Sequence, residues 1–545
     1  MRPLGRWTRE DPADYGDGQA WRVAAARPAC SCARRCPIAT QEGVYLLLRR
    51  MKLLSVTTLI VALAVTAPVS AAIPVDSSAL VDAVDAAEIN QTLVDLQAIA
   101  DANNDTRASG TSGYSASVDY IVSQLEAAGY VPTIQEFEFP YVEVLEASLE
   151  RVDPPGGPTY VYLEDFIEGF GSPNGTAVGD VVAIDVLFHS NAVSTSTSGC
   201  EASDFDDAGF VAGNIALIQR GSCDFIVKVA NAEDAGAAGV IIFNEGNAPD
   251  RMDIIFPDVT GSTIPVLGTS FEVGEDLVAQ AEEGLTMRIA LDIFSETRTT
   301  WNVLADLQGE RDDRVVLVGA HLDSVLEGPG INDNGSGSAT ILEIAEEMAD
   351  IQPVNTVRFA WWGAEESGLL GAEHYVSQLT RSELKDIAVN LNFDMVASTN
   401  YVRFVYDGDA GPVGSGVVED VFLDWFALQG LATEPTEFDG RSDYGPFILQ
   451  GVPAGGLFTG AEGIKTADEA AIYGGVVGEQ YDPCYHADCD TIANIDLEVL
   501  EQMADVAAHA TLTFAMTSSA VSGTGKGNAN GQVDDFDFKG SRAIR

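Results

Sequence analysis

Lysine is scarce in this chain of 545 residues. Six lysines are present, and 29 basic residues in total stand against 83 acidic ones, so the formal net charge is −54. A surface with this balance repels nucleic-acid phosphates and anionic membrane surfaces, which argues against nucleic-acid partners. The acidic, lysine-poor composition also fits a protein that stays soluble in salty water.

The sequence also lacks an apolar run of membrane-spanning length. The run LLSVTTLIVALAV (53–65) is shorter than the roughly 20 residues that a spanning helix needs. Basic residues precede it and the small-residue stretch APVSAA (67–72) follows, which is the order of a secretory signal peptide. We predict a signal peptide at 51–72, a secreted product (extracellular or periplasmic), and no stable membrane span after cleavage. The segment 1–50 would then be non-native or removed.

Cysteine is rare, with seven residues in the whole chain. Three of them lie in the upstream segment CSCARRC, and no matching second cluster supports a metal site there. An even number remains in the exported chain, which predicts two disulfides. The simplest pairing is Cys200 with Cys223 and Cys484 with Cys489.

Apolar periodicity divides the remaining chain into three parts. Amphipathic helices alternate with strand-like runs over 73–140, and the same texture returns over 297–518. Between them, 141–296 contains short β runs such as NIALIQRG and one clear helix, DFIVKVANAEDAGA. We predict an α/β domain interrupted by a β-rich module, followed by a flexible Gly/Asn/Asp-rich tail at 519–545.

Two runs in the α/β part, VVLVG and TVRFAWW, are almost continuously apolar. Such strands are typical of sheets buried on both faces. Ligands of open α/β sheets bind beyond the carboxyl ends of the strands, so polar residues directly after these runs are candidates for a site.

Histidines and carboxylates gather there. The candidates are His321 and Asp323 after VVLVGA, Asp333 in GINDNGSGS, Glu365 and Glu366 after TVRFAWWGA, Asp394 after AVNLNF, and His486 in DPCYHADCD. Imidazole and carboxylate together favour zinc over calcium or magnesium. A two-metal site typically needs one carboxylate shared between the ions, and Asp333 is the candidate bridge. The glycines around it would let the backbone approach the metals closely and adopt positive φ values.

Each of these residues has an ordinary structural interpretation as well. A single aspartate after a strand is more often a cap or a turn former than a ligand. The combination is harder to explain in that way. Adjacent side chains such as Glu365 and Glu366 point in different directions, so one could bind metal while the other moves protons.

Six segments, in this order, resemble the secreted bacterial di-zinc aminopeptidases of clan MH, close to the leucyl-type enzymes. They are GAHLDSVLEGPGINDNGSGSA, RFAWWGAEESGLLGAEHY, LNFDMVAS, DGRSDYGPF, GLFTGAE and CYHADCDT. The segments GDVVAIDVL, NIALIQRGSCDFIVKVANAEDAGAAGVIIFNE and TIPVLGTSF are similar to the protease-associated (PA) domain that some of these enzymes carry as an insertion. The resemblance covers most of residues 75–515 and implies a three-layer α/β/α fold with a mixed central sheet.

The resemblance also implies roles for the site residues. Two zinc ions would be bound, one by His321 and Asp394, the other by Glu366 and His486, with Asp333 bridging both. Asp323 would orient His321 without binding metal itself, because a metal-bound imidazole usually donates its other ring N–H to a carboxylate or a carbonyl.

The remaining roles concern the reaction itself. Glu365 would act as general base on a metal-bridged water, and Tyr485 would hydrogen-bond the oxyanion. Arg441 would contact a carboxylate or backbone carbonyl of the bound peptide, with a surface salt bridge as the alternative. Glu501 and Asp505 lie one helical turn apart and could share a calcium ion, as in some relatives, or simply form a solvated helix face.

The resemblance implies the function of an extracellular, monomeric aminopeptidase. It would remove N-terminal residues, large hydrophobic ones such as leucine, from peptides and proteins. Another clan MH activity, such as that of a carboxypeptidase or a glutaminyl cyclase, is the first alternative. A non-catalytic binding protein with the same fold is the second, and the complete set of ligands and base argues against it.

Overall fold

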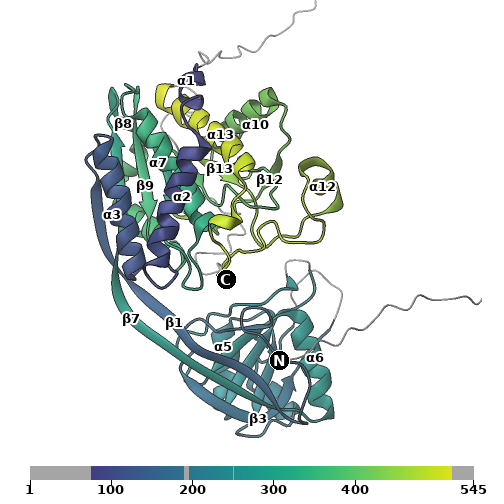
Figure 1. The fold of residues 1–545 in the computed structure, drawn as a ribbon. Helices are drawn as coiled ribbons and strands as arrows, with labels where there is room; N and C mark the ends of the chain where they lie inside the picture. Colours follow the sequence, from purple (N-terminus) through teal and green to yellow (C-terminus); the bar gives the residue numbers. More distant parts are fainter. Residues whose placement is uncertain (1–74, 189–195, 249–250, 518–545) are drawn as a thin grey trace, which may run out of the picture. The chain divides into compact units, whose positions relative to one another are not determined.

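The computed structural model describes residues 75–188, 196–248 and 251–517 (Figure 1). The predicted upstream segment, signal peptide and C-terminal tail lie outside these residues. Within the described part of the chain, no helix combines the length and the apolar character needed to cross a bilayer.

A mixed β-sheet forms the centre of the α/β part. Its four middle strands run parallel in the order β13, β10, β8, β9. Antiparallel strands follow on both sides, β11 next to β13 and β7 next to β9, while β12 pairs parallel to β11 at the end. The bounds are β7 (Thr286–Leu307), β8 (Arg311–His321), β9 (Asn355–Trp362), β10 (Ile387–Phe393), β11 (Phe404–Tyr406), β12 (Glu434–Thr436) and β13 (Ala454–Phe458).

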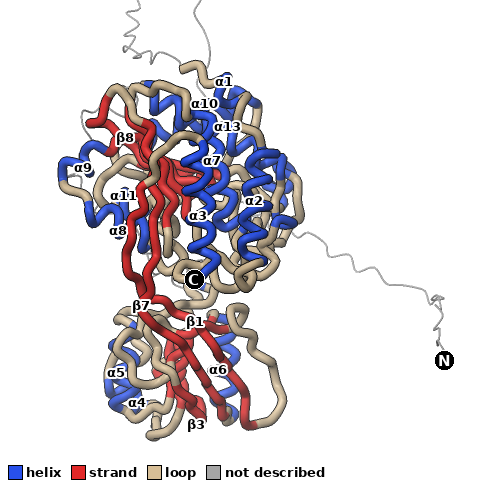
Figure 2. Tube along the Cα trace, turned by 60° about the vertical axis from the view of Figure 1, so that its left-hand side comes forward, coloured by secondary structure: helices blue, strands red, loops and turns tan. Residues whose placement is uncertain are grey.

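Helices cover both faces of this sheet (Figure 2). One face packs against α1 (Ser78–Val81), α2 (Ala86–Asp101), α3 (Ser112–Ala127), α7 (Gly337–Met348), α10 (Ser415–Gln429) and α13 (Leu497–Met516). The other packs against α8 (Leu370–Gln378), α9 (Arg381–Asp386) and α11 (Gly445–Ile448). A further short helix, α12 (Ala467–Tyr473), follows β13.

The apolar strands predicted from the sequence are buried on both faces. In β9, Phe359 and Trp361 join the core under α7 and α13, whereas Ala360 and Trp362 join the core under α8 and α11. Successive side chains of a strand point to opposite faces, so a strand covered on both sides needs an unbroken apolar run. The predicted three-layer α/β/α fold with a mixed sheet is confirmed.

Two long antiparallel strands connect this part with the inserted module. β1 (Thr133–Asp153) pairs with β7 along its length, from Thr133 with Leu304 to Asp153 with Thr286. The predicted module boundaries, residues 141 and 296, are direct partners in this ladder. The two predicted boundaries therefore lie opposite each other in the ladder. The exact position of the domain boundary stays a prediction.

The inserted module is a small layered α/β unit. Its strands are β2 (Phe166–Glu168), β3 (Gly175–Ile184), β4 (Ile215–Gln219), β5 (Gly239–Phe243) and β6 (Val266–Thr269), and its helices are α4 (Ala202–Asp207), α5 (Phe225–Asp234) and α6 (Phe271–Glu283). Of these helices, the sequence pattern predicts α5 alone. The helix α6 was not expected; it begins where the Ser270 hydroxyl accepts the amide N–H of Val273, and Gly284 follows its last residue.

A buried arginine holds the loop that follows β8. The guanidinium of Arg107 donates to the backbone carbonyls of Leu322 at 2.5 Å, Pro329 at 2.8 Å and Gly330 at 2.5 Å. Burial lowers the pKa of Arg107 to about 10, so it remains charged at neutral pH. One side chain from the N-terminal segment thus satisfies three carbonyls in a loop more than 200 residues away in sequence.

We expect Arg107→Met to lower the free energy of unfolding by about 3 kcal/mol, because three buried carbonyls lose a charged donor. Thermal unfolding followed by circular dichroism measures the change. Arg381→Met is the matched control, since Arg381 is exposed and its loss should leave the transition almost unchanged. Equal shifts in the two variants would contradict the proposed anchoring role.

Candidate active site

Parallel strands bring most of the predicted site residues to one edge of the sheet. His321 is the last residue of β8, Glu365 and Glu366 follow β9, and Asp394 directly follows β10. Because β8 lies between β9 and β10 and runs parallel to both, the three carboxyl ends meet. Sequence positions more than 70 residues apart therefore become neighbours.

Asp333 reaches the same place from the glycine-rich loop before α7. Gly330 begins the turn with a φ of +61°, and a Cβ at this position would stand 2.3 Å from the carbonyl oxygen of Asp333. Only glycine fits there. The predicted positive φ is therefore found at this glycine, and close approach of the backbone to metal ions stays a prediction.

Asp333 lies between the two histidines. One of its carboxylate oxygens is 3.3 Å from Nε2 of His321, and the other is 3.2 Å from Nε2 of His486. Each histidine has a second carboxylate beside it: Asp394 is 3.4 Å from His321, and Glu366 is 3.2 Å from His486. Two groups of three donors result, and they share Asp333.

This donor set fits metal ions. In each group the ligand atoms lie within 4.8 Å of one another. One buried oxygen of Asp394 and one of Glu366 have no hydrogen-bond partner among the described residues. A bound cation would compensate such buried carboxylate oxygens, and mixed imidazole and carboxylate ligands suit zinc.

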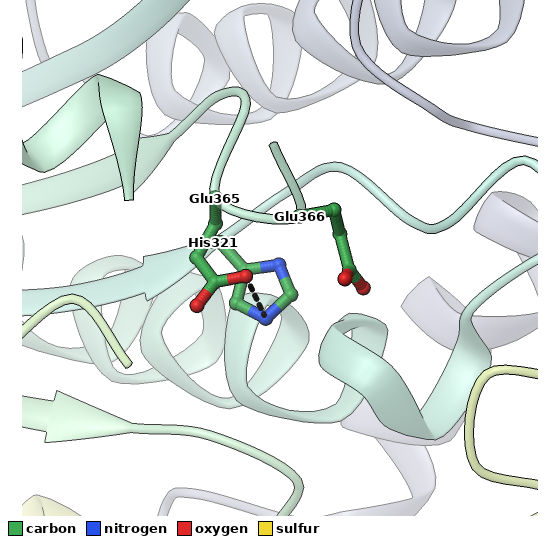
Figure 3. A group of neighbouring side chains, drawn as sticks. All are labelled: His321, Glu365 and Glu366. Atoms are coloured by element: carbon green, nitrogen blue, oxygen red, sulfur yellow. Dashed lines mark ion pairs between the residues drawn. The ribbon is translucent and has the colours of Figure 1, made fainter. Parts of the chain in front are cut away.

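Glu365 lies beside His321 without belonging to either shared group. Its carboxylate is 3.9 Å from Nε2 of His321, and the two adjacent glutamates approach the imidazole from different sides (Figure 3). Burial raises the pKa of Glu365 well above its usual range, although His321 opposes the shift. A carboxyl in such a position is suited to accept and return a proton.

Asp323 contacts His321 in a way that the sequence did not show. Nδ1 of His321 lies 3.0 Å from the backbone carbonyl of Asp323 and 3.8 Å from its carboxylate. The carboxylate instead accepts the amide N–H of Glu365 at 3.2 Å. Asp323 therefore touches both His321 and the backbone of Glu365, and burial raises its pKa to about 7.

Several residues that support the ligands had no assigned role in the sequence analysis, although most lie within the quoted motifs. Ser442 donates its hydroxyl to Asp394 at 2.5 Å. Asp490 accepts the amide N–H groups of Asn332 and Asp333 at 2.9 and 3.0 Å. Asp443 is fully buried, and neither of its carboxylate oxygens has a hydrogen-bond partner among the described residues. The acidic residues in DGRSD and DPCYHADCD were a signal that could have identified them.

A hydrogen-bond network joins the two loops that carry Asp333 and His486. Asn332 donates to Asp482 at 2.6 Å, and Asn494 donates to both Asp482 and Asp490. Asp482 also accepts the amide of Cys484. The loop from 482 to 490 is thereby fastened at both ends to the loop of the shared carboxylate.

The two predicted disulfides are present, Cys200 with Cys223 and Cys484 with Cys489. The second closes a small ring around His486, whose φ of +54° is unusual for a residue with a side chain. The ring and the network just described together hold this histidine in position.

The cluster opens into a cavity of about 250 Å³. Aromatic side chains form much of its wall, including Phe404, Tyr406, Phe458 and Tyr481. Tyr485 and Arg441 line it as well; the Tyr485 ring stacks on His486 with centroids 3.8 Å apart, and Arg441 pairs with Glu462 at 2.5 Å. A cavity with aromatic walls next to the histidine and carboxylate cluster suits a ligand with an apolar side chain and a polar reactive group.

The possible calcium ligands lie elsewhere. Glu501 accepts the amide N–H of Ala86 at 2.8 Å, so it caps α2. The pKa of Asp505 is raised to about 7 by burial and by its neighbours Glu501 and Asp82. Calcium binding at this pair stays a prediction.

Comparisons with known proteins agree with this geometry. Residues 302–511 match peptidase family M28, and residues 178–277 match the PA domain. An aminopeptidase of Pseudomonas aeruginosa is 46% identical over 447 residues, which cover 80% of this chain and 82% of that protein. Leucine aminopeptidase 2 of Trichophyton equinum is 38% identical over 411 residues, covering 74% and 78%.

Solved structures are similar as well. An aminopeptidase from Aneurinibacillus sp. strain AM-1 has a TM-score of 0.62 and 25% identity, covering 82% of this chain and 97% of its own. BSAP, a zinc aminopeptidase from Bacillus subtilis, has a TM-score of 0.55 and 26% identity, covering 80% and 99%.

The Cys484–Cys489 ring leads to a test. The double substitution Cys484→Ser with Cys489→Ser should weaken zinc binding on the order of 10-fold, because His486 loses a constraint that orients it. Competition with a chromophoric chelator measures the affinity. The control is Cys200→Ser with Cys223→Ser, which removes the other disulfide, and it should leave zinc affinity unchanged. If both pairs have the same effect, the ring has no specific role at the site.

Proposed function

This chain belongs to peptidase family M28, and from that membership and the site geometry we propose that it is a zinc-dependent aminopeptidase with two zinc ions in each subunit. The observation that carries the proposal is the position of Asp333, with one carboxylate oxygen beside each histidine. A carboxylate shared in this way is the arrangement that a two-metal site requires.

The ligands follow from the two donor groups. His321 and Asp394 would hold one zinc, Glu366 and His486 the other, and Asp333 both. When bound, the zinc ions would lower the pKa of water and polarise the scissile carbonyl.

The protein side chains supply the remaining chemistry. We propose that Glu365 takes a proton from the attacking water and passes it to the leaving amine. Tyr485, stacked on His486 at the cavity wall, would donate a hydrogen bond from its hydroxyl to the oxyanion of the tetrahedral intermediate. Both groups are positioned by contacts that exist without substrate.

The cavity favours a substrate with a free N-terminus. Its wall carries the carboxylates of Glu437 and Asp439 in addition to those of the metal cluster, so a free α-ammonium group is attracted. The aromatic wall and the leucine aminopeptidase relatives support large apolar first residues, leucine among them. These two features together favour exopeptidase action on peptide and protein N-termini.

The cellular setting is part of the proposal. Two disulfides indicate an oxidising compartment, which agrees with the predicted signal peptide at 51–72 and with an extracellular or periplasmic location. We propose that the enzyme acts there as a monomer.

The function is tested with leucine p-nitroanilide and its N-acetylated copy. Chelator-treated protein should be inactive, and added zinc should restore cleavage of the free-amine substrate alone, because the proposed site uses metal and recognises the α-amino group. Release of p-nitroaniline is the measurement. Cleavage of the blocked substrate only, or of neither, would instead favour another clan MH activity or a binding protein.

Glu365→Gln should reduce kcat by roughly 10³-fold while both zinc ions stay bound, because the amide cannot accept the proton but no ligand is lost. Zinc content measured by atomic emission accompanies the kinetics. The matched control is the adjacent Glu366→Gln, which should lose zinc together with activity. Zinc loss in the Glu365 variant would show that this residue is a ligand.

A further inference from the structure

Arg441 is the only lysine or arginine among the described residues that line the cavity, and its guanidinium is already engaged. Nη1 lies 2.5 Å from Oε1 of Glu462, and Nη2 donates a hydrogen bond to the hydroxyl oxygen of Tyr485 at 3.2 Å. Glu462, Arg441 and Tyr485 thus form a chain that leads to the cavity.

The bond from Arg441 affects which way the Tyr485 hydroxyl can point. A phenol oxygen that accepts a hydrogen bond must direct its own proton elsewhere. The Tyr485 ring is fixed against His486, with an interplanar angle of 24°, so the hydroxyl stands at a defined place beside the cluster. A charged donor also polarises the hydroxyl and strengthens the hydrogen bond that it can donate.

The surroundings of Arg441 disfavour direct binding of a substrate carboxylate. Glu462 and Tyr485 already accept hydrogen bonds from two of its N–H groups, and a substrate carboxylate that reached the others would enter a cavity that also holds the carboxylates of Glu437 and Asp439. Like charges in such a site disfavour the anionic group.

We infer that Arg441 is a positioning residue: held by Glu462, it directs the Tyr485 hydroxyl proton toward the oxyanion instead of binding the peptide itself. The inference rests on the proposed function and deepens it, since it assigns the oxyanion donor a fixed support. Glu462, an exposed glutamate at the cavity wall, becomes the residue that holds Arg441.

A double-mutant cycle tests the coupling. Tyr485→Phe should lower kcat for leucine p-nitroanilide on the order of 100-fold, and Arg441→Met on the order of 10-fold, each with little change in KM. In the Tyr485→Phe background, Arg441→Met should not lower kcat any further, because Arg441 acts through the hydroxyl that this variant lacks. Arg441→Lys should lower kcat less than Arg441→Met does. Glu462→Gln should also lower kcat, by a smaller factor than Arg441→Met.

Three comparisons separate this role from a structural one and from substrate binding. Zinc content and thermal midpoint should be the same in all variants. Arg311→Met, which removes an exposed arginine paired with Asp313 outside the cavity, should leave kcat unchanged. The Arg441→Met variant should hydrolyse leucylglycine and leucylglycine amide more slowly than wild type by the same factor. Effects that add across the cycle, or a rise in KM for the free acid alone, would overturn the inference.

Failure of the proposed function would be visible separately. Wild-type turnover of the anilide tests that function, whereas binding of the phosphonic acid analogue of leucine, a mimic of the tetrahedral intermediate, tests the coupling without turnover. Isothermal titration should show Arg441→Met and Tyr485→Phe weakening this analogue non-additively. The inference is wrong if the zinc-loaded wild type does not bind the analogue, or if the losses of affinity in the two variants are additive. Either result counts against it even if the wild type cleaves the anilide.

Discussion

Buried negative charge at the carboxyl ends of β8, β9 and β10 is the constraint on which the rest of this structure depends. Asp333, Glu365, Glu366 and Asp394 surround two histidines in a small volume. Carboxylates cannot be buried together without compensation, and the histidines respond: burial lowers the pKa of His486, but Glu366 and Asp333 raise it to about 10. Two bound zinc ions would supply the same compensation in the proposed enzyme.

The cost also explains how much of the surrounding structure holds these groups in place. Arg107 anchors the loop before Asp333, Asp490 accepts the two backbone amides at Asn332 and Asp333, and Ser442 donates to Asp394. These supports come from the loop between α2 and α3, from the loop before α13 and from the loop before α11, respectively. Ligands set in this way lose little freedom when metal binds, so the site is organised before substrate arrives.

The inserted module enters the chain without disturbing the site. It is attached through β1 and β7, whose ladder continues the edge of the central sheet beyond β9. The strands that carry ligands, β8 to β10, all follow the insertion, and only the N-terminal helices and β1 precede it. An insertion at the edge strand leaves the parallel core and its carboxyl ends intact.

Much of the fold and of the candidate site could be predicted from the sequence because both depend on local patterns. Continuous apolar runs indicated strands buried on both faces, and polar residues directly after them indicated the ligands, since a strand end determines where the next side chains stand. Cysteine spacing indicated both disulfides. The α6 helix was not predicted, because a short amphipathic run that contains Gly274 gives a weak helical signal between strand-like runs.

The sequence by itself determined which residues could bind metal and the order in which they follow the strands. Only the tertiary structure decided which partners they meet. Asp323 faces His321 through its backbone carbonyl, Asp490 supports Asp333 from 157 residues away, and Arg441 donates to Tyr485, 44 residues further along the chain. Contacts of this kind depend on how loops from different elements pack together, and no local periodicity encodes that packing.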